Sequence, residues 1–166
     1  PAAALPLRVL LVGDSTTASG GGYGDSLCRR FKPPVECLNL GFNGRSSGSY
    51  RAEGLWPSVL DRVREGGAGT VVLIQFGHND QPGKPGRSTD LANEFPANLT
   101  RYLVEVKAVG GLPVLVTPLT RRSFRDGVLN NDLRPWAEAT LAVAAAQQVS
   151  VLDLNSSSAA AVQAMG

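Results

Sequence analysis

Residues 70–76 read Thr-Val-Val-Leu-Ile-Gln-Phe and are almost continuously apolar. A short run of this kind, rich in β-branched residues, is typical of a strand that is buried on both faces of a parallel sheet. Four further apolar runs are expected to be strands, at residues 8–12, 35–40, 112–117 and 149–154. The sequence therefore predicts five strands, of which residues 70–76 are the clearest.

Helical patterns lie between these strands. Apolar residues recur at helical spacing over residues 55–63 and again over residues 99–109, and residues 136–148 are rich in alanine. The pair Gly110-Gly111 is a stop signal for the second of these helices. Alternating strands and helices predict an α/β protein, a three-layer α/β/α sandwich around a five-stranded parallel sheet. We expect residues 1–166 to form a single domain.

The composition excludes several classes of protein. Hydrophobic residues make up 43% and charged residues 18% of the chain, which is the balance of a globular protein. The net charge of +2 is small and the basic residues are scattered, so we expect no nucleic-acid partner. The longest apolar runs are too short to span a bilayer, so we expect no membrane partner. The chain begins with Pro1, and we expect a processed or trimmed product.

Cysteine and histidine are scarce. Cys28 and Cys37 are the two cysteines and His78 is the one histidine, so no zinc site of ordinary spacing can be built from them. We expect neither a metal nor a cofactor. The two cysteines are either buried thiols or, in an exported protein, one structural disulfide.

Three of the predicted strands are followed by unusual polar stretches. Residues 13–18 read Gly-Asp-Ser-Thr-Thr-Ala, residues 41–47 read Gly-Phe-Asn-Gly-Arg-Ser-Ser, and residues 77–80 read Gly-His-Asn-Asp. Ligand and active sites of open α/β sheets form at the carboxyl ends of the strands. The three stretches are therefore expected to meet at one edge of the sheet.

These three stretches resemble, in order and position, the first three signature blocks of the SGNH (GDSL-like) hydrolases. Together with residues 117–122, Thr-Pro-Leu-Thr-Arg-Arg, they are most similar to the rhamnogalacturonan acetylesterase branch. The resemblance covers nearly the whole chain. It implies the flavodoxin-like SGNH hydrolase fold and a serine esterase.

The resemblance assigns Ser15 as nucleophile, and the backbone N–H groups of Ser15 and Gly44 and the side-chain amide of Asn79 as oxyanion donors. A serine on a tight turn at a strand end is exposed to substrate, and a glycine lets a substrate oxygen approach the backbone closely. Each assignment has a structural alternative: Ser15 as the cap of the next helix, Gly44 as the residue that permits a left-handed turn, and Asn79-Asp80 as a loop turn pair.

Asp14, Arg45 and His78 are the residues expected close to the substrate. Asp14 is also expected to stabilise the turn before the nucleophile rather than to act as a catalytic acid. For His78 three roles stay open, namely packing or hydrogen bonding within its loop, substrate contact, and direct service as the base.

The fourth block of the family, Asp-x-x-His, does not occur in residues 1–166. Its histidine deprotonates the serine in such enzymes, and its aspartate orients the histidine. We expect the chain to lack a C-terminal segment that carries the block, although a natural variant without the block is the alternative. Residues 1–166 alone are then expected to be nearly inactive. Asp153 is expected to order the loop before the last helix.

The function expected from the resemblance is removal of acetyl groups from a polysaccharide such as rhamnogalacturonan through a serine acyl-enzyme. The protein is then expected to be secreted or periplasmic, because polymeric pectin lies outside cells. Alternatives are an esterase of short-chain lipid or aryl esters and a carbohydrate-binding protein that has lost catalysis. A nucleotide-binding domain is disfavoured, since neither phosphate-binding glycine motif is present.

Overall fold

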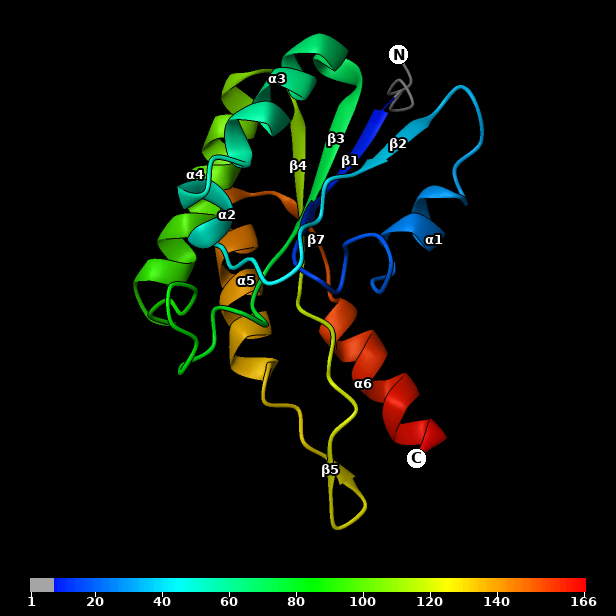
Figure 1. Ribbon diagram of the computed structural model, residues 1–166, viewed down its shortest axis with the longest axis vertical. Helices are drawn as coiled ribbons and strands as arrows, with labels where there is room; N and C mark the ends of the chain where they lie inside the picture. Colours follow the sequence, from blue (N-terminus) through cyan, green and yellow to red (C-terminus); the bar gives the residue numbers. More distant parts are fainter. Residues whose placement is uncertain (1–7) are drawn as a thin grey trace.

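The computed structural model describes residues 8–166 and centres on a five-stranded sheet in the order β2-β1-β3-β4-β7 (Figure 1). All four pairings between neighbouring strands are parallel, as expected. The strands are β1 (Arg8–Gly13), β2 (Glu36–Asn39), β3 (Thr70–Gln75), β4 (Leu112–Val116) and β7 (Ser150–Leu152). Each of the five predicted strands is therefore confirmed. Residues 1–4, the opening stretch of the expected processed product, lie outside the described residues.

Helices pack against both faces of this sheet, which confirms the expected three layers. Four helices lie on one side, α2 (Ser49–Ala52), α3 (Trp56–Gly66), α4 (Glu94–Ala108) and α5 (Arg134–Gln147). The other side carries α1 (Gly24–Cys28) and α6 (Leu154–Met165) (Figure 1). A short 3₁₀ turn, Gly67–Gly69, precedes β3, and the small hairpin of β5 (Phe124–Arg125) and β6 (Val128–Leu129) projects beside the end of α6. Within residues 8–166 no helix is long and apolar enough to cross a membrane.

The main core lies between the sheet and the four-helix side. Val72 and Ile74 of β3 point into it and are fully buried, as are Leu103 and Val106 of α4. Aromatic rings fill the end nearer the polar loops, where Phe76 stacks on a neighbouring ring at 5.6 Å. Each such side chain contributes roughly 1.5–3 kcal/mol by leaving water. This packing fixes the strands whose ends carry the polar loops.

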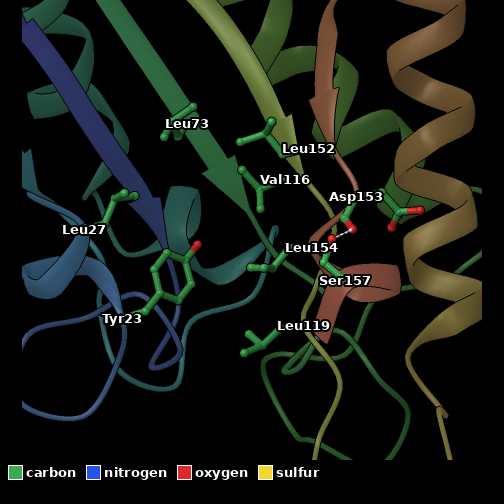
Figure 2. A pocket seen from close by; sticks show the side chains of 9 residues that line it. All are labelled: Tyr23, Leu27, Leu73, Val116, Leu119, Leu152, Asp153, Leu154 and Ser157. Atoms are coloured by element: carbon green, nitrogen blue, oxygen red, sulfur yellow. Dashed lines mark hydrogen bonds between the residues drawn. The ribbon is translucent and has the colours of Figure 1, made fainter. Parts of the chain in front are cut away.

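The opposite face of the sheet is only partly covered. Between α1 and α6 an apolar groove of about 510 Å³ remains open, and side chains from β3, β4 and β7 form its floor (Figure 2). Leu73 points into it and is half-buried, while Leu152 is 55% exposed. The expectation that β3 is buried on both faces is therefore wrong for this face, because α1 and α6 stand at its two margins.

Asp153 starts α6 as its N-cap. Its carboxylate accepts hydrogen bonds from the backbone N–H of Ser156 at 3.2 Å and from the hydroxyl of Thr117 at 2.9 Å. Partial burial acts to raise the pKa of Asp153, but these hydrogen bonds and the nearby Arg134 outweigh it and lower the pKa. The expected role of Asp153, ordering the loop before the last helix, is confirmed.

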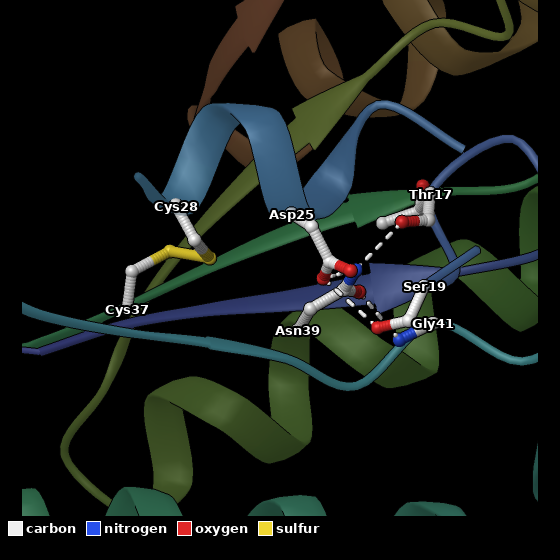
Figure 3. The surroundings of a disulfide bond; sticks show 7 residues. All are labelled: Thr17, Ser19, Asp25, Cys28, Cys37, Asn39 and Gly41. Carbon is white, nitrogen blue, oxygen red and sulfur yellow. Dashed lines mark hydrogen bonds between the residues drawn. A yellow bond between two sulfur atoms is a disulfide. The ribbon is translucent and has the colours of Figure 1, made fainter. Parts of the chain in front are cut away.

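A disulfide bond joins Cys28 at the end of α1 to Cys37 in β2 (Figure 3). Of the two alternatives for the cysteines, the structure therefore has the disulfide. The bond closes a short loop, since the two residues are nine positions apart. It fastens α1, which has only five residues, to the edge of the sheet.

Replacing both cysteines, Cys28→Ser together with Cys37→Ser, is expected to lower the free energy of unfolding by about 2–3 kcal/mol, because the unfolded chain regains the freedom that the closed loop removes. Urea denaturation followed by circular dichroism measures the change. The wild type treated with a reductant is the matched control and should unfold at the midpoint of the double variant. Equal midpoints for the variant and the oxidised wild type would contradict the prediction.

Candidate active site

Ser15 occupies a tight turn directly after β1. The backbone N–H groups of Thr17 and Ala18 both donate to the carbonyl of Asp14, at 3.1 and 2.9 Å, and the chain doubles back at this point. Ser15 is exposed, and it lines an open pocket of about 540 Å³ together with Asn43 of the loop after β2. The next helix, α1, begins only at Gly24 with Tyr23 as its N-cap, so Ser15 does not cap it.

The Asp14 carboxylate stabilises this turn through hydrogen bonds. Its Oδ1 accepts hydrogen bonds from the N–H of Thr16 at 2.9 Å and from the Thr16 hydroxyl at 2.7 Å. The same hydroxyl accepts a hydrogen bond from the amide of Gln75 at 2.7 Å, and the Gln75 carbonyl accepts one from Tyr23 at 2.5 Å. The turn is thereby tied to the end of β3. Asp14 stabilises the turn as expected.

A second polar cluster supports the turn from the side of the disulfide (Figure 3). The amide of Asn39 donates to the carbonyl of Thr17 at 2.8 Å and to the carboxylate of Asp25 at 2.9 Å. The hydroxyl of Ser19 donates to the same carboxylate oxygen at 2.9 Å. The hydrogen bonds from Asn39 and Ser19 lower the pKa of Asp25. The carboxylate thus connects α1 to both β2 and the Ser15 turn.

Gly44 lies in the loop after β2 and adopts a left-handed conformation, with φ at +75°. Glycine reaches this region at little cost, as the sequence analysis allowed. The loop joins the first one through the N–H of Phe42, which donates to the carbonyl of Gly13 at 2.9 Å. Among residues 8–166 neither the N–H of Ser15 nor that of Gly44 forms a hydrogen bond. Both of the backbone donors expected for an oxyanion are therefore unused.

Asn79 brings the loop after β3 to the same place. Its side-chain amide donates to the carbonyl of Arg45 at 3.0 Å, one residue beyond Gly44. A primary amide carries two N–H groups, so one is left for a further acceptor. Asn79 is 7% exposed. The three predicted loops therefore meet at one edge of the sheet.

Asp80 fastens the second loop to the third. Its buried carboxylate accepts hydrogen bonds from the hydroxyl of Ser47 at 2.5 Å, from the N–H of Ser47 and from the hydroxyl of Thr89 at 2.8 Å. Burial raises the pKa of Asp80 to about 6, the hydrogen bonds from Ser47 and Thr89 oppose this rise, and the Asp14 charge adds to it. Asp80 was expected only as part of a possible loop turn, and its role as a tie between loops was missed.

The three residues expected near the substrate lie at different depths. Arg45 is half-buried at the rim and pairs with Glu53 at 2.9 Å. Asp14 is fully buried, and His78 is 6% exposed. The Nε2 atom of the His78 ring lies 2.8 Å from the carbonyl of Leu119, and its Nδ1 atom lies 3.4 Å from the Asp14 carboxylate. Of the three, only Arg45 is open to solvent.

Arg87 is a rim residue that the sequence did not single out. A Cβ atom at Gly44 would lie 3.4 Å from the Arg87 guanidinium carbon, so the guanidinium group lies next to Gly44. Arg87 is exposed, and in the described part of the chain its side chain forms no ion pair or hydrogen bond. The loop that carries it is ordered, since the N–H of Thr89 donates to the carbonyl of Asp80 at 3.0 Å.

The described residues contain no group of three or more His, Cys, Asp or Glu side chains that is placed to hold a metal ion.

Known proteins are similar to this chain over most of its length. The sequence model of the GDSL-like lipase/acylhydrolase family matches residues 11–165. The chain belongs to this family. It is 30% identical over 154 residues to the probable rhamnogalacturonan acetylesterase YesY of Bacillus subtilis, a match that spans 89% of this chain and 70% of the relative. It is 33% identical over 157 residues to the rhamnogalacturonan acetylesterase RhgT of the same organism, over 90% of this chain and 65% of the relative.

Solved structures show the same fold. The protein YxiM of Bacillus subtilis superposes with a TM-score of 0.80 at 23% identity, over 98% of this chain and 48% of YxiM. The acetylxylan esterase Axe2 of Geobacillus stearothermophilus superposes with a TM-score of 0.72 at 18% identity, over 96% of this chain and 81% of Axe2. The chain thus spans about two thirds of these curated relatives and about half of YxiM.

The raised pKa of Asp80 gives a pH dependence of stability with a defined sign. The folded protein holds the Asp80 proton more tightly than the unfolded chain does, so this contribution is complete below about pH 4 and is lost as pH rises through about 6. In Asp80→Asn the contribution is absent. The free energy of unfolding of the wild type minus that of the variant should fall by up to about 3 kcal/mol between pH 4 and pH 7. Urea unfolding across this range measures it, and a difference that is constant or rises with pH would contradict it.

Proposed function

We propose that the protein is a carbohydrate acetylesterase in which Ser15 is the nucleophile. The observation that carries the proposal is the convergence of an exposed serine hydroxyl with unused N–H donors at Ser15 and Gly44 and a partly used amide at Asn79. Hydrogen-bond donors that are fixed before the reaction are what an ester hydrolysis needs for its oxyanion. The curated relatives, which are named rhamnogalacturonan acetylesterases, support the same reaction.

The proposed reaction proceeds in two steps. The Ser15 oxygen bonds to the acetyl carbonyl carbon while a base takes its proton, and the carbonyl oxygen becomes an oxyanion held by Ser15, Gly44 and Asn79. The sugar oxygen then leaves with the proton that the base took from Ser15. Water next attacks the acetyl carbon while the base takes one of its protons and passes it to the Ser15 oxygen, which releases acetate and restores the serine. His78 is not assigned as the base, because its two ring nitrogens face Leu119 and Asp14.

Charge at the rim favours an acidic polysaccharide as substrate. Arg45 is neutralised by Glu53, and Arg121 lies near Asp132 at 3.7 Å, whereas Arg87 has no such partner among residues 8–166. A free guanidinium next to Gly44 suits a substrate carboxylate close to the ester. Rhamnogalacturonan is therefore the first substrate to test, and acetylated xylan, which carries fewer acidic groups, is the comparison.

We also propose that the protein acts outside the reducing cytosol, in the periplasm or after secretion. The disulfide between Cys28 and Cys37 supports this, since such bonds persist in oxidising compartments. A carbohydrate-binding protein without catalysis is the alternative function. It would bind the same polymer but leave Ser15 unlabelled by a fluorophosphonate probe.

Acetate release from acetylated rhamnogalacturonan tests the catalytic proposal, with the full-length gene product and residues 1–166 assayed side by side. Ser15→Ala is expected to lower kcat by about 10⁶. Asn79→Ala is expected to lower it by about 10²–10³, because one oxyanion donor is lost. Ser58→Ala, an exposed serine on α3, is the matched control and should behave as the wild type. Acetate release that survives in Ser15→Ala would refute the assignment.

Arg87→Gln keeps most of the side chain and removes its charge. We expect kcat/KM for acetylated rhamnogalacturonan to fall about fivefold, the equivalent of roughly 1 kcal/mol for an exposed ion pair, while the value for acetylated xylan stays unchanged. Arg64→Gln, which removes an exposed charge from α3, should affect neither substrate. Equal losses on the two polymers would argue against recognition of a carboxylate by Arg87.

A further inference from the structure

Two buried polar atoms face each other beneath the Ser15 turn. Asp14 Oδ2 and His78 Nδ1 are 3.4 Å apart, and the two side chains are 0% and 8% exposed. Among residues 8–166 neither atom has a hydrogen-bond partner. A buried polar atom without a partner costs about 1–3 kcal/mol, so a pair of them calls for a physical reason.

The position of one ring proton of His78 follows from the contact of its Nε2 atom. Nε2 lies 2.8 Å from the backbone carbonyl of Leu119, and a carbonyl oxygen only accepts hydrogen bonds. Nε2 therefore carries a proton. In a neutral ring Nδ1 would then be bare, and its lone pair would point at a carboxylate oxygen. That arrangement sets two acceptors against each other at a separation of 3.4 Å.

We propose that His78 carries a second proton on Nδ1 and shares it with Asp14 Oδ2, so that the two side chains form a positioning pair. Nε2–H then donates to Leu119 and Nδ1–H to Asp14, and both buried atoms are satisfied. The proton also balances charge. Asp80 is a second buried carboxylate whose pKa is raised partly by Asp14. Tyr23, whose pKa Asp14 also raises, and Arg121, which donates to the backbone carbonyl of His78, are two further titratable or charged groups near the pair.

The pair links the proposed nucleophile to a proposed oxyanion donor, and this consequence rests on the proposed function. Asp14 precedes Ser15 in the chain, and His78 precedes Asn79. A hydrogen bond between Asp14 and His78 therefore fixes the distance between the loop that holds Ser15 and the loop that holds Asn79, at positions directly next to these two residues. It also removes the last lone pair of the ring, which leaves His78 unable to accept the Ser15 proton.

The protonation state of the His78 ring can be measured without assignment of other histidines, because the 166-residue chain contains a single histidine. Long-range ¹H–¹⁵N correlation spectra of the histidine-labelled chain at pH 7.5 should show both ring nitrogens protonated, whereas an ordinary histidine is about nine-tenths neutral at this pH. In Asp14→Asn the signal of Nδ1 should shift to that of a bare nitrogen. A bare Nδ1 in the wild type, or identical spectra for wild type and variant, would overturn the proposal.

Two substitutions separate the two hydrogen bonds of the ring in the full-length gene product. Asparagine in His78→Asn keeps a donor near the position of Nδ1, and glutamine in His78→Gln keeps one near Nε2. We expect kcat to fall about 10- to 100-fold further in His78→Gln than in His78→Asn, with KM nearly unchanged in both. Equal kcat values would overturn the positioning role. If the wild type hydrolyses no ester, the proposed function fails, and the spectra still decide the state of the pair.

Discussion

The parallel pairing of β1 with β3 is the constraint on which the site depends. Its register sets Gly13 opposite Gln75, so both strands end at the same level of the sheet. The turn that holds Ser15 and the loop that holds Asn79 therefore leave the sheet side by side, although 64 positions separate them in the chain. The core packing of β1 and β3 therefore fixes the backbone positions from which the side chains of the site extend.

Polar side chains then fix the loops to one another. Asp80 spans the loops after β2 and β3, and Asp14 ties the Ser15 turn to Gln75 through Thr16. Burial of a carboxylate costs free energy unless its oxygens find donors. Asp80 has such donors on both oxygens, whereas one oxygen of Asp14 depends on His78. The loops are thus held by two buried carboxylates, Asp14 and Asp80, that lie close enough for the charge of Asp14 to raise the pKa of Asp80.

The strands and the meeting of three loops were predictable because the short apolar runs and the motifs that begin at residues 13, 41 and 77 are local signals. The burial of His78 was not predictable, since it depends on Leu119 in a loop far along the chain. Arg87 was not predictable for the same reason, since only folding brings its loop to Gly44. A polar residue in a motif indicates a functional position. Whether its side chain contacts substrate or stabilises a neighbouring residue depends on the packing of the folded chain.

The open apolar groove beside β7 has a thermodynamic consequence. Leu152 and its neighbours already meet water in the folded chain, so unfolding exposes less new hydrocarbon than the chain length suggests. The heat-capacity change of unfolding and the denaturant m-value both increase with the surface that unfolding newly exposes. The folded domain should therefore show a shallow curve of stability against temperature and a low urea m-value for its size, and a ligand that covers the groove would steepen both.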